Sequence, residues 1–320
     1  MLFVTNREPT GSIDTGTTER EFEFDLDKNS PSNSIYCCRR VEKDKYIEIG
    51  ATKMMSELKD HPAKQLLFFI HGFSNLPEPD IFPRVEKLQE YFDHKEKDLI
   101  CVVPIIWPCD NDIGIVKDYW DDQKSADKSA FSFARALQFF MDWRDKAPED
   151  DPCLKRINVL AHSMGNRVFR ETLSVWDKYD LANGVPLLFR NTILMAADIV
   201  NESLEEGETG RLISQSSRNV SVYFASDDLA LRSSKISNLK NKVASRRLGH
   251  TGPEDMDKTQ SNVYAIDCDN FNNKYDTPKG HSYFLDDDNG EIGSVFKHLF
   301  NTIKTGRVDV DDKVNRTHIL

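Results

Sequence analysis

The stretch LAHSMGNRVF, residues 160–169, places a single serine, Ser163, between two patterns of different period. The residues before it, RINVLA at 156–161, form an apolar run typical of a buried strand. The residues after it, 165–178, bring apolar side chains to one face of a helix. The sequence therefore predicts a strand, a tight turn and a helix, with Ser163 either a nucleophile in the turn or a cap of the helix.

The same alternation of strand and helix patterns continues along the chain. Short apolar runs that predict strands are LLFFI (66–70), LICVVPIIW (99–107), INVLA (157–161), TILMAA (192–197), VSVYFA (220–225) and VYAIDC (263–268). Helical patterns lie at 82–93, 124–144, 165–178 and 292–304. Strands joined by helices in this way pair in parallel, so we expect an α/β fold whose mostly parallel central sheet carries helices on both faces.

The first fifty residues follow a different pattern. LFVTN (2–6), IYCCRRV (35–41) and YIEIG (46–50) are strand-like runs without helices between them. We expect them to form antiparallel strands at one edge of the sheet. The simplest organisation is a single domain over residues 1–304, followed by a charged, flexible tail at 305–320.

Composition and charge restrict the classes of function. The 320 residues carry a formal net charge of −11, which disfavours binding to nucleic acid or to an anionic membrane surface. No apolar run is long enough to predict a membrane span, and the first residues do not resemble a signal peptide. The six cysteines are scattered without C-x-x-C spacing, as in proteins of reducing compartments. We therefore expect a soluble, cytoplasmic protein.

The pentapeptide AHSMG, Ala161–Gly165, is close to the pattern G-x-S-x-G of serine nucleophiles. In that pattern, small residues on either side of the serine let a strand and a helix approach closely. The turn exposes the hydroxyl and directs the next backbone N–H, here that of Met164, at the developing oxyanion. A serine that only caps a helix is the alternative at this point.

Two later segments supply an acid and a histidine in the order that this chemistry requires. Asp227 and Asp228 follow VSVYFAS, and His281 follows VYAIDC in the segment KGHSYF. Taken alone, the aspartates predict a helix cap and the histidine a surface residue. Because nucleophile, acid and histidine each follow a strand in this order, together they predict a catalytic triad. Asp198, after TILMAA, is the rival acid.

A second oxyanion donor is predicted after an earlier strand. LLFFI is followed by His71, Gly72 and Phe73, and the glycine permits a close backbone turn. We expect the N–H of Phe73 to bind the oxyanion together with that of Met164, although a glycine that merely ends a strand is the alternative. No set of His, Cys and Asp residues has the spacing of a metal site, so we expect neither a metal nor a cofactor.

Together these segments resemble a bacterial esterase-like α/β-hydrolase family whose physiological roles are largely undescribed. The resemblance covers nearly the whole chain and rests on LFVTNRE, HGF, WP, AHSMGNRV, SDDLALRSS and GHSYF. It implies the α/β-hydrolase fold, with Ser163 as nucleophile, Asp228 as acid and His281 as base. The family pattern D-x-A-L begins at Asp228 and so favours it over Asp227, and it leaves Asp198 a structural or pocket-edge role.

These observations lead to the hypothesis of an esterase- or lipase-like serine hydrolase. It would cleave the carboxylic ester of a small molecule, or a thioester or amide, through an acyl-enzyme intermediate. Two alternatives stay open. A non-catalytic binding protein could use the same scaffold, since a fold does not determine a function. An acyltransferase would use the same triad and replace water by an alcohol or an amine.

Overall fold

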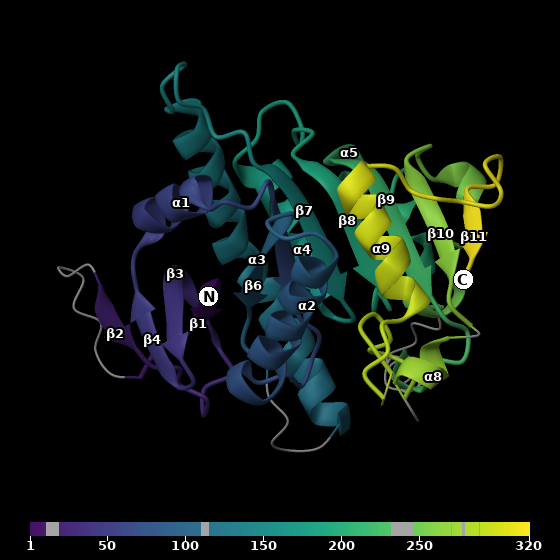
Figure 1. Cartoon of the computed structure of the whole chain (residues 1–320), viewed down its shortest axis with the longest axis horizontal. Coiled ribbons are helices and arrows are strands. Elements are labelled where there is room, and N and C mark those ends of the chain that lie inside the picture. The colour runs from purple at the N-terminus through teal and green to yellow at the C-terminus, as the bar shows by residue number, and fades with distance from the viewer. Residues whose placement is uncertain (11–18, 110–114, 232–245, 270, 277–278, 288) are drawn as a thin grey trace. The chain divides into compact units, whose positions relative to one another are not determined.

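The computed structural model describes residues 1–10, 19–109, 115–231, 246–269, 271–276, 279–287 and 289–320. These residues cluster into two compact units. Unit 1 comprises Met1–Arg156 and Glu171–Asn183, and unit 2 comprises Ile157–Arg170 and Gly184–Leu320. Each unit holds a run of adjacent, hydrogen-bonded strands (Figure 1).

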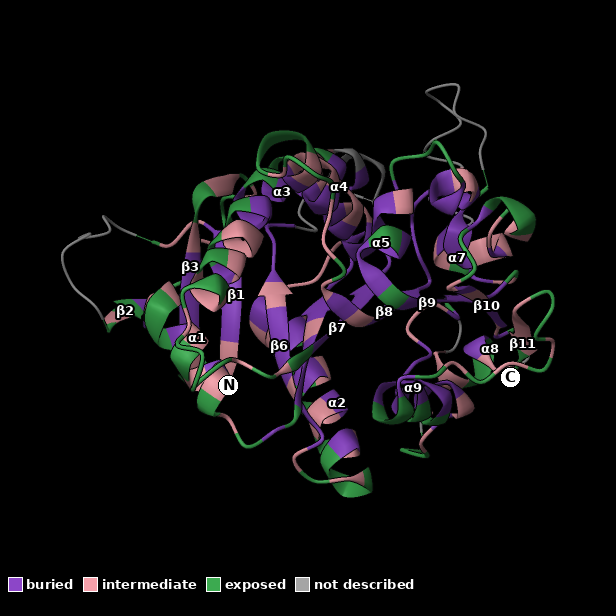
Figure 2. Cartoon of the chain, turned by 90° about the horizontal axis from the view of Figure 1, so that it is seen from above, coloured by how far each residue is buried: buried purple, intermediate pink, exposed green. Residues whose placement is uncertain are grey.

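Within its described residues, unit 2 is built on five parallel strands. In spatial order these are β7 (Arg156–His162), β8 (Phe189–Met195), β9 (Ser217–Phe224), β10 (Val263–Asp267) and β11 (Thr317–Ile319). The helices are α4 (Gly165–Tyr179, which continues into unit 1), α5 (Arg211–Gln215), α7 (Leu248–Thr251), α8 (Asn272–Tyr275) and α9 (Ser294–Thr305), with short 3₁₀ turns at Asn201–Leu204 and Met256–Lys258. Figure 2 shows α5 and α7 on one side of these strands and α9 on the other. Cover on both faces explains why the strand sequences are almost continuously apolar.

A row of three asparagines crosses the buried interior of this sheet. Asn158, Asn191 and Asn219 are neighbours in register on β7, β8 and β9. Nδ2 of Asn191 donates to Oδ1 of Asn158 at 2.7 Å, and Nδ2 of Asn219 donates to Oδ1 of Asn191 at 2.9 Å. Buried amides that lack a partner are costly, so the row favours this register of the strands over a shifted one.

Unit 1 combines parallel and antiparallel strands. In spatial order these are β5 (Gln65–Ile70), β6 (Ile100–Ile106), β1 (Leu2–Arg7), β3 (Pro31–Glu42), β4 (Lys45–Glu48) and β2 (Arg20–Phe22). β1 pairs in parallel with β6 and antiparallel with β3, and all pairs beyond β3 are antiparallel. The helices are α1 (Ala51–Asp60), α2 (Phe82–Lys95) and α3 (Ile115–Asp145), preceded at α2 by a π-helical turn at Pro77–Ile81. The predicted α/β class, mostly parallel with antiparallel edge strands from the first fifty residues, is confirmed.

The last residues of the chain join the sheet of unit 2. β11 pairs in parallel with β10, and the ring of His318 in β11 stacks on that of His298 in α9, with 5.0 Å between the centroids. The segment expected to form a flexible tail, 305–320, therefore contains a strand, which at three residues is too short to show a periodicity. The single domain over 1–304 stays a prediction. No helix in the described part of the chain is both long and apolar enough to cross a membrane.

Candidate active site

The carboxyl ends of the parallel strands bring four of the predicted site residues to one edge of unit 2. β7 is followed directly by Ser163, β8 by the segment with Asp198, β9 by that with Asp228, and β10 by the loop that carries His281. Parallel strands all end at the same edge, which is where open α/β sheets bind their ligands.

Ser163 occupies a strained turn between β7 and α4. Its φ of 54° lies in the left-handed region, which residues with a branched or bulky side chain avoid and other non-glycine residues seldom adopt. Its N–H donates to the carbonyl oxygen of Met195 at 3.0 Å, and its own carbonyl oxygen accepts from the N–H of Asp198 at 3.1 Å. Strand β8 and the residues after it therefore hold the turn in its strained conformation.

Asn166, in the first turn of α4, also holds this turn, and the sequence analysis missed it. Its side chain is fully buried, and its Nδ2 donates to the carbonyl oxygens of Ala161 and Ser163, each at 2.9 Å. The amide thus binds the backbone both before the turn and at its centre. The only signal for Asn166 in the sequence is its position three residues after the serine. The function of an asparagine at that position becomes evident only in the folded turn.

Asp228 makes two different hydrogen bonds through its two carboxylate oxygens. Its side chain is fully buried. Oδ1 accepts from the N–H of Leu231 at 2.9 Å and so caps the helical turn that begins at Leu229. Oδ2 accepts from Nδ1 of His281 at 2.7 Å. Helix capping and contact with the histidine, which the sequence presented as alternatives, therefore occur in the same side chain.

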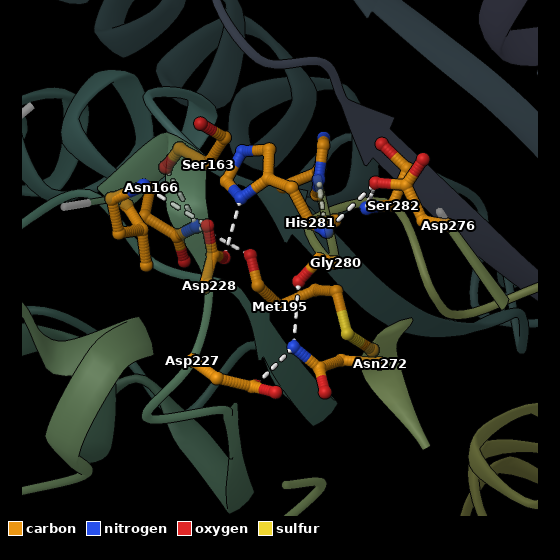
Figure 3. Close-up of polar contacts among 12 residues, drawn as sticks. Ser163, Asn166, Met195, Asp227, Asp228, Asn272, Asp276, Gly280, His281 and Ser282 are labelled. Carbon is orange, nitrogen blue, oxygen red and sulfur yellow. Dashed lines mark hydrogen bonds and ion pairs between the residues drawn. The ribbon is translucent and has the colours of Figure 1, made fainter. Parts of the chain in front are cut away.

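The hydrogen bond to Asp228 fixes the protonation of the His281 ring. A carboxylate only accepts, so Nδ1 carries the proton, and Nε2 of the neutral ring is left as an acceptor. Figure 3 shows the ring between Asp228 and Ser163, with its other nitrogen turned toward the serine. The side chain of His281 is 13% exposed and that of Ser163 belongs to a residue only 5% exposed, so both lie in a mostly dry environment.

Opposing effects act on the pKa of His281. Burial lowers it, because the charged ring loses hydration. The negative charge of Asp228 and its hydrogen bond raise the pKa, and the charges of Asp198 and Asp276 add to this effect. The result is a pKa above the ordinary 6.5, which makes His281 a stronger base than a free histidine.

Asp198, the rival acid, forms an ion pair with Arg247. Its Oδ1 lies 3.1 Å from Nε of Arg247, and the two side chains are 4% and 7% exposed. The segment with Arg247 is attached to the residues around Asp198 by backbone hydrogen bonds, from Leu248 N–H to Ile199 O at 2.8 Å and from Gly249 N–H to Ala197 O at 2.9 Å. Asp198 therefore acts on His281 through its charge while it anchors this segment.

His162, directly before the serine, packs against the same loop. Its Nε2 donates to the carbonyl oxygen of His281 at 3.1 Å, and the centroids of the two rings are 4.8 Å apart. The His162 ring also contacts that of Phe284, with 5.3 Å between the centroids. This histidine thus supports the backbone of His281 from the end of β7.

The two predicted oxyanion donors belong to different units. Met164 follows the serine in unit 2, and its side chain is buried. Phe73 lies in unit 1, after β5, where its ring contacts that of Tyr119 and its carbonyl oxygen accepts from Nδ2 of Asn75 at 2.6 Å. Their joint action as an oxyanion hole stays a prediction. In the described ranges, no group of three or more His, Cys, Asp or Glu side chains is arranged to hold a metal ion.

A parallel sheet whose strand ends carry a serine turn, a carboxylate and a histidine in this order has the scaffold of an α/β hydrolase. Residues 48–292 match the model of the family described as "Alpha/beta hydrolase of unknown function (DUF900)", and the chain belongs to this family. The resemblance and the fold inferred from the sequence are thereby confirmed.

Two solved structures of phospholipase PlaB from Legionella pneumophila, one of them in complex with thio-NAD, are similar to the chain. They are 14% and 13% identical, with TM-scores of 0.28 and 0.29. The matches cover 63% and 64% of this chain and 37% and 39% of the PlaB chains, so the chain spans well under half the length of that protein. No curated protein matches the chain.

Proposed function

We propose that the protein is a serine hydrolase that cleaves a carboxylic ester of a small molecule, or a thioester or amide, through an acyl-enzyme intermediate. The observation that carries this proposal is the 2.7 Å hydrogen bond from Nδ1 of His281 to the buried Asp228, next to a serine in a strained turn. A carboxylate that fixes one ring nitrogen leaves the other available to take the proton of a serine.

Acylation follows from these positions. Nε2 of His281 takes the hydroxyl proton of Ser163 while the serine oxygen forms a bond to the carbonyl carbon. The carbonyl oxygen becomes negative, and we propose that the N–H of Met164 binds it, with the N–H of Phe73 as the second donor predicted from the sequence. His281, now positive and stabilised by Asp228, gives its proton to the leaving alcohol as the ester bond breaks.

Deacylation repeats the same steps with water. His281 removes a proton from the water molecule, which attacks the acyl carbon, and returns the proton to Ser163 when the acid leaves. An alcohol or amine in place of water would give acyl transfer with the same residues. The ratio of acid to transfer product, measured with added alcohol, separates these two outcomes.

The test is covalent labelling with a fluorophosphonate probe. We expect wild type to be labelled and Ser163→Ala to be neither labelled nor active, because the proposed attachment point is gone while the fold is kept. Ser261→Ala is the control, since Ser261 is an exposed serine of unit 2 and its loss should leave labelling unchanged. Undiminished labelling of folded Ser163→Ala would refute the assignment, and an unlabelled wild type would favour a binding protein on the hydrolase scaffold.

We also propose that the enzyme works in the cytoplasm. The support is its cysteine chemistry: Cys37, Cys38 and Cys268 are buried, free thiols. Reducing compartments keep such thiols unpaired. Fractionation of cells that express the tagged protein tests this location.

A further inference from the structure

The two loops that carry Asp228 and His281 are joined by side chains that the proposed mechanism does not use. Nδ2 of Asn272 donates to Oδ1 of Asp227 at 2.5 Å and to the carbonyl oxygen of Gly280 at 3.1 Å (Figure 3). Asp227 precedes the proposed acid in the chain, and Gly280 precedes the proposed base. A single amide therefore connects the neighbours of both residues.

We propose that Asp227, Asn272 and the backbone of Gly280 form a clamp that positions Asp228 and His281 relative to each other. This inference rests on the proposed function, because it assigns the clamp to the triad of that hydrolase. Asp227 and Asn272 are positioning residues, which act through the hydrogen bond between the acid and the histidine. When reactive groups are held in place before the substrate binds, less free energy is needed to order them in the transition state.

The clamp is tightly packed. The side chain of Asn272 is fully buried. Gly280 has a φ of +61°, and a Cβ atom at this position would lie 2.6 Å from Nδ2 of Asn272. Glycine is therefore needed here both for the backbone conformation and for the approach of the amide to the carbonyl oxygen.

Two further sets of hydrogen bonds hold the same loops. The N–H of Leu229 donates to the carbonyl oxygen of Lys279 at 3.1 Å. Oδ2 of Asp276 accepts from the N–H groups of His281 and Ser282, both at 2.7 Å. The backbone is thus fixed on both sides of the histidine, and the clamp ties that backbone to the loop of the acid.

The charged and titratable groups around the His281 ring make its pKa a readout of the clamp. Asp228 is bonded to Nδ1, Asp198 and Asp276 contribute negative charge, and the ring of His162 lies beside it. Burial alone lowers the pKa and Asp228 raises it, so any displacement of Asp228 from the ring lowers the pKa of His281. This measurement requires no substrate.

The experiment compares Asp227→Ala with Asp227→Asn. Both variants remove the same charge and the acceptor of Nδ2 of Asn273 at the second carboxylate oxygen, but asparagine keeps a carbonyl oxygen that can accept from Asn272. Proton NMR titration of the His281 ring, assigned with His281→Gln, gives its pKa in each variant. We expect this pKa to be lower in Asp227→Ala than in Asp227→Asn by about half a unit or more. On an activated ester, kcat should be about tenfold lower in Asp227→Ala, with KM within about twofold.

Asn272→Ala is the second variant, because it breaks both bonds of the amide without any change of charge. It should lower the pKa of His281 in the same direction. Values for Asp227→Ala and Asp227→Asn that agree within about 0.2 unit would overturn the proposal. Loss of the folded state in both Asp227→Ala and Asn272→Ala would also overturn it, since the contacts would then serve folding. Because the titration needs no turnover, an inactive wild type contradicts the proposed function and leaves the result for the clamp readable.

Discussion

Two histidines that follow strands in this molecule, one fully buried and one mostly buried, have opposite acid–base properties. His281 follows β10 in unit 2, and His71 directly follows β5 in unit 1. The pKa of His281 lies above 6.5, whereas burial lowers the pKa of His71 to about 3. Burial disfavours the charged ring at both positions, so the difference comes from the groups that each ring contacts.

Both ring nitrogens of His71 contact backbone groups, and Nδ1 also lies 4.0 Å from Sγ of Cys109. Nδ1 lies 2.7 Å from the carbonyl oxygen of Gly72, and Nε2 lies 3.1 Å from the backbone nitrogen of Trp107. A carbonyl only accepts and an amide N–H only donates, so the ring is protonated on Nδ1 and accepts at Nε2. Protonation of Nε2 would bring two donors face to face. The neutral ring therefore links the end of β5 to the end of β6, where the ring of Trp107 stacks on it at 5.2 Å.

The comparison shows how the same type of side chain, histidine, can have opposite acid–base properties at two positions. The carboxylate of Asp228 raises the pKa of His281 against the effect of burial, so the ring keeps its capacity to take up a proton, which a catalytic base requires. At His71 no carboxylate opposes the effect of burial, so the pKa stays far below that range and the neutral ring serves as a structural link. The chemistry of the partner, and not the burial of the ring, separates the two sites.

The largest expected effect concerns the ionised partner. In Asp228→Asn the amide cannot stabilise the positive ring and favours the wrong tautomer, so kcat on an activated ester should fall by about 10³–10⁴-fold. Circular dichroism checks that the variant is folded. A loss of kcat of less than about tenfold would contradict the assignment of Asp228 as the acid, and with it the contrast between His281 and His71.

The central strands β5 to β10 could be predicted from the sequence because they are largely apolar runs, but the beginnings of β8 and β9 could not. β8 starts at Phe189 rather than at the predicted 192, and β9 at Ser217 rather than at 220. Apart from Phe189, the residues of both extra segments are polar, and they include Asn191 and Asn219, which pair across the sheet. That pairing depends on the neighbouring strand, so no periodicity within one strand reveals it.

The residues of the candidate site also differ in whether the sequence alone reveals them. The order of Ser163, Asp228 and His281 along the chain, each after a strand, was visible because parallel strands end at one edge. The supporting residues Asn166 and Asn272 were not visible. Their amides bind backbone groups of loops whose paths are set only by the folded chain.

The second prediction concerns Asp198, which acts on His281 by charge. Asp198→Asn leaves the buried guanidinium of Arg247 without its partner, so the free energy of unfolding should fall by about 3 kcal/mol. The effect on kcat should stay at about tenfold or less, a barrier change of about 1.4 kcal/mol. Urea unfolding and ester kinetics measure both. If kcat falls more than in Asp228→Asn, the acid lies one strand earlier than we propose.

The third prediction concerns the structural link. His71→Gln removes the contact with the Trp107 ring and weakens two hydrogen bonds, so the free energy of unfolding at pH 7 should fall by about 2 kcal/mol. The contribution of neutral His71 to wild-type stability is fully present above pH 6.5 and is lost as pH falls toward 3, because the unfolded chain binds the proton first.

The difference between wild type and His71→Gln should therefore shrink below pH 6.5, by up to about 1.4 kcal/mol per pH unit, and reverse in sign below about pH 5. Urea unfolding at pH 7, 5.5 and 4 measures it. A difference that is the same at all three pH values would contradict the neutral, structural role of His71.

The smallest expected effect is a shift in the pH profile, and it tests both histidines at once. His281 must be neutral to act as a base, so kcat/KM should rise with pH as the ring loses its proton. Because the pKa of His281 is raised, the midpoint of this rise should lie above 6.5.

In Asp198→Asn one of the charges that raise the pKa of His281 is absent, so the midpoint should move to lower pH by a fraction of a unit. His71, with a pKa of about 3, should add no second rise between pH 5 and 9. A wild-type midpoint below 6.5, or one that does not move in Asp198→Asn, would mean that the negative charges around His281 do not outweigh its burial.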